Sequence, residues 1–458
     1  MKYKFTLLIV AACFLLNGTI TAQKKMPDES IKKIDQNTLI ASIGKLLKER
    51  YLYVDSAAKM HDFLLERHKN GAYKHVRTAR ELGREITKDL LANFHDRHLS
   101  VMYAPRLVEM LNAGTPSEPS QEEIDAELNV EVYKNFQLPE MRVMKGNIGY
   151  LRIDTFLPPR YARGYAEKIM ACFEFLGDTE ALIIDLRENP GGYGDGVEFF
   201  LSYLLPPNTH ISTEVSRIPN GGMMETLGYS GSVEGRAYLE KPLYILTSPR
   251  TASAAEATAH ALKYSNRATI VGEYSYGAGY LGDDFPVDDK YIMRISYAVG
   301  KHPNAPGNWE GVGVEPDIQA SYGQAEIVAR ERIVQELLNL ERKKSKDQLR
   351  ESVTQALEWE SKRLKDIQNP LILDAEQVEE YVGKYENRRI LLIDGVLYYY
   401  RSNPDRPKRK MIPIAKDEFL LEGLDDYRIG FDRDKKTFSI GTLRLYSVDR
   451  LLISKKDD

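Results

Sequence analysis

The stretch LYILTSPRTASAAEATAHALKY at residues 243–264 joins a short apolar run to an alanine-rich run through a turn. The run 243–246 predicts a buried strand, the turn contains Pro249, and the residues from Ala254 onward favour a helix. Ser253 stands at the junction, at or beside the helix N-cap. Backbone N–H groups at a helix start lack acceptors, so they can stabilise an oxyanion beside the hydroxyl. The stretch alone leaves open whether Ser253 is a cap or a nucleophile.

Two further segments place this stretch in an α/β layer. The apolar run 181–186 follows a predicted helix at about 160–176 and leads into a glycine turn at 189–192. A strand that is apolar throughout indicates a sheet buried on both faces. A similar strand follows at 268–273. The alternation of strands and helices predicts an α/β core over residues 140–322.

Different patterns lie on either side of this core. Residues 23–110 predict an N-terminal helical module, because apolar residues recur at helical spacing in the segments 39–51, 57–70 and 78–94. Residues 323–369 predict a helical connecting arm. Residues 370–458 carry short alternating runs divided by turns, which predict a small antiparallel β domain of unknown role.

The composition excludes several classes of function. The 458 residues, 43% of them hydrophobic, are enough for two or three domains with ordinary cores. A net charge of −4, from 63 basic and 67 acidic residues, gives no electrostatic basis for binding nucleic acid. Of the two cysteines, Cys172 alone remains after removal of a leader, so we expect neither an internal disulfide nor a cysteine-rich metal site. We expect no cofactor and no metal.

The N-terminus has the pattern of a secretory signal peptide. A basic start and an apolar run at residues 5–16 precede a small-residue cleavage site at Ala22, so we interpret residues 1–22 as the leader. The mature chain would be exported to the periplasm or the exterior of a bacterial envelope. A lipid anchor at Cys13 is the less favoured alternative, because very apolar residues follow it. A run of about 12 apolar residues is shorter than the roughly 20 that span a bilayer, so we expect no transmembrane span in the mature chain.

Four motifs in order resemble the C-terminal processing (tail-specific) protease family of serine peptidases. They are DLRENPGG at 185–192, TASAAE at 251–256, VGE at 271–273 and EGVGVEPD at 310–317. Residues 30–105 are similar to the helical N-terminal module of relatives of interphotoreceptor retinoid-binding protein. The resemblance implies a Clp protease/crotonase-like core of layered ββα units, with the active site at strand-to-helix turns. It also implies a serine-type peptidase, a hydrolase, that acts on peptides or unfolded proteins.

By this resemblance Ser253 is the nucleophile, and the oxyanion hole consists of the N–H of Ala254 with that of Gly191 or Gly192. The tail-specific branch has a lysine base in a Gly-Lys-Gly setting. Ala278 stands at that position here, which excludes a serine–lysine pair at this place. The segment before the core is also too short for the PDZ module that this branch usually carries.

A second branch, similar to the tricorn protease core, has a histidine from the module before the core and a glutamate before the Gly-Val-x-Pro-Asp motif. His98 and Glu310 occupy those places. A neutral imidazole can accept the serine proton, and a carboxylate can orient it. His302 is the second candidate base, and Asp96 is the alternative to Glu310.

The predicted catalytic residues are therefore Ser253, His98 and Glu310. A histidine base with an ordinary pKa of about 6.5 predicts activity that rises with pH through that value. The alternative is a non-catalytic protein that binds peptides or apolar ligands on the same scaffold, since the retinoid-binding relatives keep this architecture.

Overall fold

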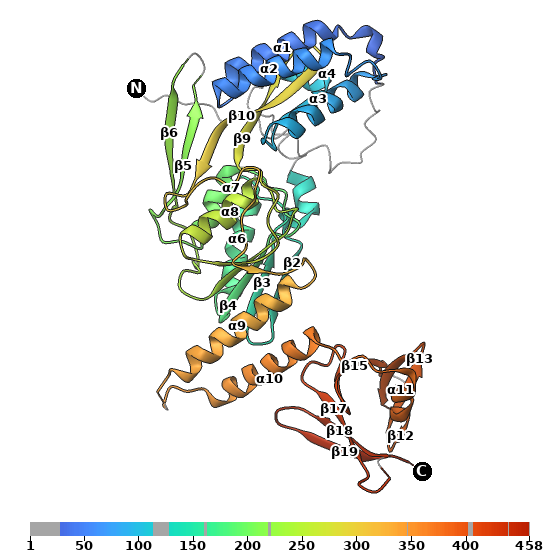
Figure 1. Cartoon of the computed structure of the whole chain (residues 1–458). Coiled ribbons are helices and arrows are strands. Elements are labelled where there is room, and N and C mark those ends of the chain that lie inside the picture. The colour runs from blue at the N-terminus through green and yellow to red at the C-terminus, as the bar shows by residue number, and fades with distance from the viewer. Residues whose placement is uncertain are drawn as a thin grey trace. The chain divides into compact units, whose positions relative to one another are not determined.

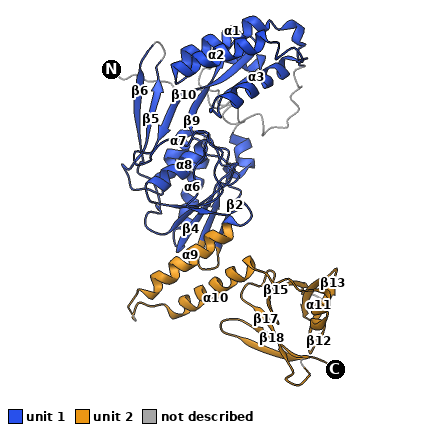
Figure 2. Ribbon diagram, in the orientation of Figure 1, with its two compact units in different colours: residues 1–143, 149–325 blue, residues 144–148, 326–458 orange. Residues whose placement is uncertain are grey.

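The computed structural model describes residues 28–112, 128–159, 163–218, 221–345, 347–401, 406–437 and 439–457. Two compact units make up the chain (Figure 2): unit 1 covers residues 1–143 and 149–325, and unit 2 covers residues 144–148 and 326–458. The proposed leader at 1–22, with Cys13, lies outside the described residues. No helix in the described ranges is both long and apolar enough to cross a membrane.

Unit 1 begins with the predicted helices, drawn in blue in Figure 1: α1 (Gln36–Arg50), α2 (Val54–Lys69) and α3 (Ala79–Asn93). The short strand β1 (Ser100–Tyr103) and helix α4 (Pro105–Asn112) follow. The buried faces of α1, α2 and α3 share one apolar core with Tyr291, Met293 and Ile295, which lie far along the chain. The helical module is therefore packed against a sheet rather than built from local contacts alone.

That sheet has five strands in the order β1-β10-β5-β6, with β9 paired to β10. Its longer strands are β5 (His210–Arg217), β6 (Met223–Tyr229), β9 (Tyr280–Pro286) and β10 (Tyr291–Lys301). Ser100 pairs with Arg294 and Tyr103 with Tyr291 in antiparallel register. β1 thereby fixes the segment that precedes it, which contains His98, to β10.

The second sheet of unit 1 has the order β11-β8-β7-β4-β3-β2. Its strands are β2 (Glu140–Met144), β3 (Ile148–Arg152), β4 (Ala181–Asp185), β7 (Leu243–Thr247), β8 (Thr269–Gly272) and β11 (Ile318–Gln319). β4 and β7 are buried at every position, as the apolar runs predict. Helices α6 (Arg163–Leu176), α7 (Gly194–Leu201) and α8 (Ala254–Tyr264) contribute to the same core. The predicted mixed α/β class is confirmed.

The parallel pairing of β4, β7 and β8 determines where polar loops meet. Parallel strands have their carboxyl ends at one edge of a sheet, and loops at that edge are the usual place for a site. β4 leads into the glycine turn, β7 into the turn with Ser253, and β8 into the loop with Ala278. Three of the segments singled out in the sequence thus leave the sheet at the same edge.

Unit 2 contains the helices α9 (Ala325–Arg342), α10 (Glu351–Gln368) and α11 (Ala375–Tyr381) and an eight-stranded antiparallel sheet. The strands are β12 (Gly383–Tyr385), β13 (Arg388–Ile393), β14 (Val396–Arg401), β15 (Arg409–Ala415), β16 (Glu418–Leu421), β17 (Arg428–Arg433), β18 (Ile440–Tyr446) and β19 (Leu451–Lys455). The predicted C-terminal antiparallel sheet is present. Almost all of the predicted arm, residues 326–369, belongs to the same compact unit as the sheet.

Candidate active site

Ser253 has an unusual backbone conformation at the start of α8. Its φ is 51° and its ψ is −116°, a region that residues with a side chain rarely occupy. The turn before it is tied to the β4 turn, because the Ala252 N–H donates to the Asn189 carbonyl at 3.0 Å. Strained backbone of this kind persists only where its surroundings hold it, and it is concentrated at functional sites.

The glycine turn after β4 lies directly against Ser253. Gly191 has a φ of 126° and Gly192 a φ of 138°, which favour glycine. A Cβ on Gly191 would lie 3.0 Å from the Ser253 Cβ and 3.3 Å from the Ala254 nitrogen. A Cβ on Gly192 would lie 2.2 Å from the Phe156 carbonyl oxygen. The turn therefore approaches the start of α8 in a way that only glycine allows.

Two of the three N–H groups expected to form an oxyanion hole are unpaired. The Gly191 N–H donates to Oδ1 of Asn189 at 2.8 Å and is thereby occupied. The N–H groups of Gly192 and Ala254 have no acceptor among the described residues. Since the sequence left Gly191 and Gly192 as alternatives, the hydrogen bond to Asn189 leaves Gly192 as the available donor.

Glu256 is a buried carboxylate in the first turn of α8 and is fully removed from solvent. Its oxygens accept the Ser253 N–H at 2.8 Å, the Gly277 N–H at 2.6 Å and the Ala278 N–H at 2.8 Å. The Ser275 hydroxyl donates to it at 2.6 Å. Burial raises the pKa of Glu256, while these four donors oppose the rise. Glu256 braces the turn that contains Ser253 against the loop after β8.

His98 is half-buried in the segment before β1. Its backbone N–H donates to Oδ1 of Asp96 at 2.9 Å. Neither imidazole nitrogen has a hydrogen-bond partner in the described part of the chain, and Nδ1 is buried. Burial, with a smaller contribution from Arg294, lowers the pKa of His98 to about 4. The ring is therefore neutral at neutral pH, although no hydrogen bond joins it to Ser253 in this structure.

Glu310 lies beside the same segment but contacts its backbone rather than the imidazole. Its carboxylate accepts the Arg97 N–H at 2.7 Å, the Gly279 N–H at 2.5 Å and the Tyr280 N–H at 2.9 Å. Burial, with a smaller contribution from Asp96, raises the pKa of Glu310 to about 7. The structure thus brings Glu310 to the residue next to His98.

Asp96, the alternative to Glu310, also contacts backbone rather than the ring. It is buried, and its Oδ1 accepts the His98 N–H and the Ser296 hydroxyl, the latter at 3.0 Å. Both carboxylates therefore hold the segment that carries His98 through its main chain.

His302, the second candidate base, is far from Ser253. Its Nε2 bonds with the Ser265 hydroxyl at 3.0 Å, and its Nδ1 accepts the Asn304 N–H at 3.2 Å. Ser265 is the C-cap of α8, whereas Ser253 is the N-cap. At about 1.5 Å per residue, the 11 residues of α8 separate these two ends by roughly 16 Å. His302 is therefore out of reach of the Ser253 hydroxyl.

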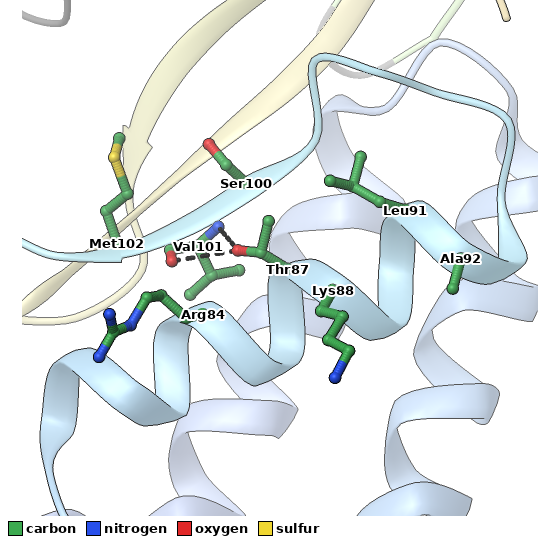
Figure 3. Close-up of a pocket in the computed structure, with 8 residues that line it drawn as sticks. All are labelled: Arg84, Thr87, Lys88, Leu91, Ala92, Ser100, Val101 and Met102. Atoms are coloured by element: carbon green, nitrogen blue, oxygen red, sulfur yellow. Dashed lines mark hydrogen bonds between the residues drawn. The ribbon is translucent and has the colours of Figure 1, made fainter.

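Other features of unit 1 lie apart from this constellation. A groove runs between α3 and β1 and is lined by Arg84, Thr87, Lys88, Leu91, Ala92, Ser100, Val101 and Met102 (Figure 3). The Thr87 hydroxyl accepts the Val101 N–H at 2.8 Å at its base. No lining residue is one of the predicted site residues. Within the described ranges, no cluster of histidine, cysteine, aspartate or glutamate is arranged to hold a metal ion.

Sequence comparisons place known families on these same segments. Residues 147–320 match the sequence model of Peptidase family S41. Residues 33–138 match the model described as the N-terminal domain of this peptidase family in eukaryotic IRBP. The first match contains Ser253 and Glu310, and the second contains His98.

Curated relatives include carboxy-terminal processing proteases. The protein CtpB of Bacillus subtilis is 30% identical over 180 residues, which are 39% of this chain and 35% of that protein. The carboxyl-terminal-processing protease of Synechocystis is 29% identical over 172 residues, 37% of each chain. The protease of Bartonella bacilliformis is 26% identical over 241 residues, 51% of this chain and 54% of the relative. The chain therefore spans about a third to a half of the length of these relatives.

Solved structures with partial likeness include the photosystem II D1 C-terminal processing protease. It is 15% identical with a TM-score of 0.41, over 63% of this chain and 94% of that one. The tricorn protease is 13% identical with a TM-score of 0.38, over 63% of this chain and 34% of that one.

Proposed function

We propose that the protein is a serine-type peptidase that cleaves peptides or unfolded proteins through an acyl-enzyme on Ser253, since residues 147–320 match the sequence model of Peptidase family S41. The observation that carries this proposal is the strained turn at Ser253, with its φ of 51°. The turn brings the serine against Gly191. The next residue of the glycine turn, Gly192, and the residue after the serine, Ala254, each have an unpaired N–H group. A nucleophile beside two free amide donors is the arrangement that acyl transfer needs.

In the proposed reaction the Ser253 oxygen attacks the scissile carbonyl carbon, and its proton passes to the neutral imidazole of His98. The N–H groups of Gly192 and Ala254 donate to the oxyanion that forms, and loss of one such donor typically costs about 10²–10³ in rate. The intermediate then expels the amine, which takes the proton from His98. Water, deprotonated by the same imidazole, hydrolyses the acyl-enzyme.

His98 must approach Ser253 more closely in the substrate complex than it does here, because no hydrogen bond joins them. Catalytic hydrogen bonds are often long in unliganded enzymes and shorten when substrate binds. The proposed role of Glu310 is to position His98 through the Arg97 backbone, which it holds at 2.7 Å. No cofactor or metal takes part in these steps.

The proposal extends to architecture and location. Residues 140–322 would form a crotonase-like peptidase core after an N-terminal module at 23–110, and the arm at 323–369 would fold together with the β domain at 370–458. The leader pattern at residues 1–22 supports export to the periplasm or the cell exterior.

A second candidate function is non-catalytic binding of a peptide or an apolar ligand. Two observations favour it: Ala278 replaces the lysine of the tail-specific branch, and the His98 ring is not bonded to Ser253. The unpaired amides beside Ser253 favour catalysis instead, since a binding protein has no need of an oxyanion hole.

The two candidates differ in the reactivity of Ser253. A fluorophosphonate probe should label the wild-type protein at this residue and leave Ser253→Ala unlabelled, and the same variant should not cleave a denatured protein. Removal of a hydroxyl at a helix N-cap costs only about 0.5–2 kcal/mol, so the variant should stay folded. Normal cleavage by Ser253→Ala would refute the assignment, and a wild-type protein that neither labels nor cleaves would favour the binding protein.

A further inference from the structure

Four consecutive amides, three in the loop after β8 and one at the start of β9, donate to two different carboxylates. The N–H groups of Gly277 and Ala278 donate to Glu256, and those of Gly279 and Tyr280 donate to Glu310. We call residues 277–280 the amide bridge. The first three of these residues are buried.

Each carboxylate also holds a segment of the proposed active site. Glu256 accepts the N–H of Ser253 itself, at 2.8 Å. Glu310 accepts the N–H of Arg97, the residue before His98, at 2.7 Å. A continuous path of hydrogen bonds therefore runs from the nucleophile to the neighbour of the base.

The amide bridge is itself fixed to the loop that carries Glu310. The Gly311 N–H donates to the Gly277 carbonyl at 2.8 Å. A Cβ on Gly279 would lie 2.1 Å from Oδ1 of Asn308 and 2.6 Å from the Glu310 nitrogen. That Asn308 oxygen accepts the Glu310 N–H at 2.8 Å. Such close backbone contacts let neither loop shift alone, since packed interiors transmit displacements.

We propose that Glu256 is a positioning residue and that the amide bridge, held between Glu256 and Glu310, couples the geometry of the Ser253 turn to that of the segment bearing His98. The bridge occupies the place of the lysine base in the tail-specific branch, and here its backbone donors align the two catalytic segments. This inference rests on the proposed function for its effect on rate, but the coupling itself is a property of the fold.

A double-mutant cycle on Glu256→Gln and Glu310→Gln tests the coupling. A glutamine keeps the shape but replaces one accepting oxygen by a donor group, so each variant should lower kcat by about 10² with little change in KM. Because both changes loosen the same bridge, the double variant should be within about threefold of the slower single variant. Independent effects would multiply to about 10⁴ and overturn the proposal.

The matched control is Glu273→Gln, the same chemical change in the same unit. Glu273 accepts the Tyr322 N–H at 3.0 Å and does not contact Ser253 or the bridge. Its kcat should stay within about threefold of wild type. A loss of kcat as large as that of Glu256→Gln would mean that any glutamate change in this unit harms the enzyme. That result would refute the positioning role of Glu256.

Hydrogen exchange tests the same coupling without activity. Glu256→Gln should accelerate amide exchange at 277–280 and also at 95–99, which Glu256 does not touch. Acceleration confined to 253–256 and 277–278 would overturn the proposal. If Glu256→Gln does not fold, Ser275→Ala replaces it, because this change removes one donor to Glu256. It should accelerate amide exchange in the same two segments. If wild type shows no labelling by fluorophosphonate, the proposed function fails, and the exchange pattern still decides whether the bridge couples the two segments.

Discussion

At the scale of single residues, burial shifts the proton affinities of His98 and Glu310 in opposite directions. The pKa of His98 falls to about 4, and that of Glu310 rises to about 7. His98 is thus ready to accept a proton throughout the neutral range. Glu310, whose charged form is the better acceptor for three backbone N–H groups, changes its charge near pH 7.

The first prediction is a two-step acid limb in the pH dependence of kcat/KM. Activity should rise with pH through about 7, as Glu310 ionises and holds the Arg97 segment, with a lower limb near 4 from His98. The single limb near 6.5 expected from the sequence assumed an ordinary histidine, and burial of the ring moves it. In Glu310→Gln the limb near 7 should disappear while the one near 4 remains; a limb that stays near 7 would assign it to another group.

The same shift predicts how stability changes with pH. The folded-state pKa of Glu310, about 7, lies above its ordinary value of 4.5, so the folded state binds the proton more tightly. The contribution is fully present below pH 4.5 and is lost as pH rises through 7. The midpoint of thermal unfolding should therefore fall less for Glu310→Gln than for wild type when the pH is raised from 5 to 7.5. Equal falls in the two midpoints would contradict the raised pKa of Glu310.

The residue types and their order were enough to single out Ser253 and the two glycines, because both turns follow apolar strands. The hydrogen bond from the Gly191 N–H to the Asn189 side chain was not predicted, since it depends on the rotamer of Asn189. The backbone partners of Glu310 were also missed. One of them, the Arg97 N–H, lies more than 200 residues away in the chain, and no local pattern signals such a contact.

At the scale of helices and strands, the sequence predicted elements that bury one clear face. Strands β4 and β7 and the helix α8 follow their apolar patterns closely. Strand β6 was missed because nearly all of its residues are exposed, so it has no alternation to detect. Its neighbour β5 is only partly buried and gave no signal either.

An element-scale prediction concerns Gly83 in α3. Alanine is favoured over glycine in a helix by about 0.5–1 kcal/mol. A Cβ on Gly83 would, however, lie 2.7 Å from the Val101 carbonyl oxygen of β1, and overpacking of this kind typically costs about 1–3 kcal/mol. Gly83→Ala should therefore lower the midpoint of thermal unfolding despite its better helix propensity.

The control for this prediction is Gly194→Ala at the start of α7, where a Cβ meets nothing within 4 Å. That change should leave the midpoint unchanged or slightly raised. If Gly83→Ala also raises the midpoint of thermal unfolding, α3 can move away from β1 without cost. The close approach of α3 to β1 would then not hold the segment that contains His98.

At the scale of the whole molecule, the compact units differ from the domain pattern expected from the sequence. The composition changes at Pro370, which suggested a boundary between a helical arm and a β domain. In the structure two ion pairs join α10 to the sheet region. Nη1 of Arg363 on α10 lies 3.3 Å from Oδ1 of Asp425, just before β17. Nη2 of Arg428 on β17, which is almost fully buried, lies 2.6 Å from Oδ2 of Asp366 on α10. A composition shift reports local structure, whereas these contacts form only after the chain has folded.

The last prediction compares two fragments, residues 326–458 and residues 370–458. The shorter one loses α9 and α10 and leaves the buried Arg428 without Asp366 and without the Trp359 ring that lies 5.1 Å from its guanidinium. Breaking a buried ion pair by removing one partner costs about 3–5 kcal/mol, which in a domain of this size lowers the unfolding midpoint by roughly 10 °C or more. In the longer fragment Asp366→Asn should reproduce part of that loss. Equal midpoints for the two fragments would restore the boundary at 369/370, because they would show that the sheet is stable without the helices.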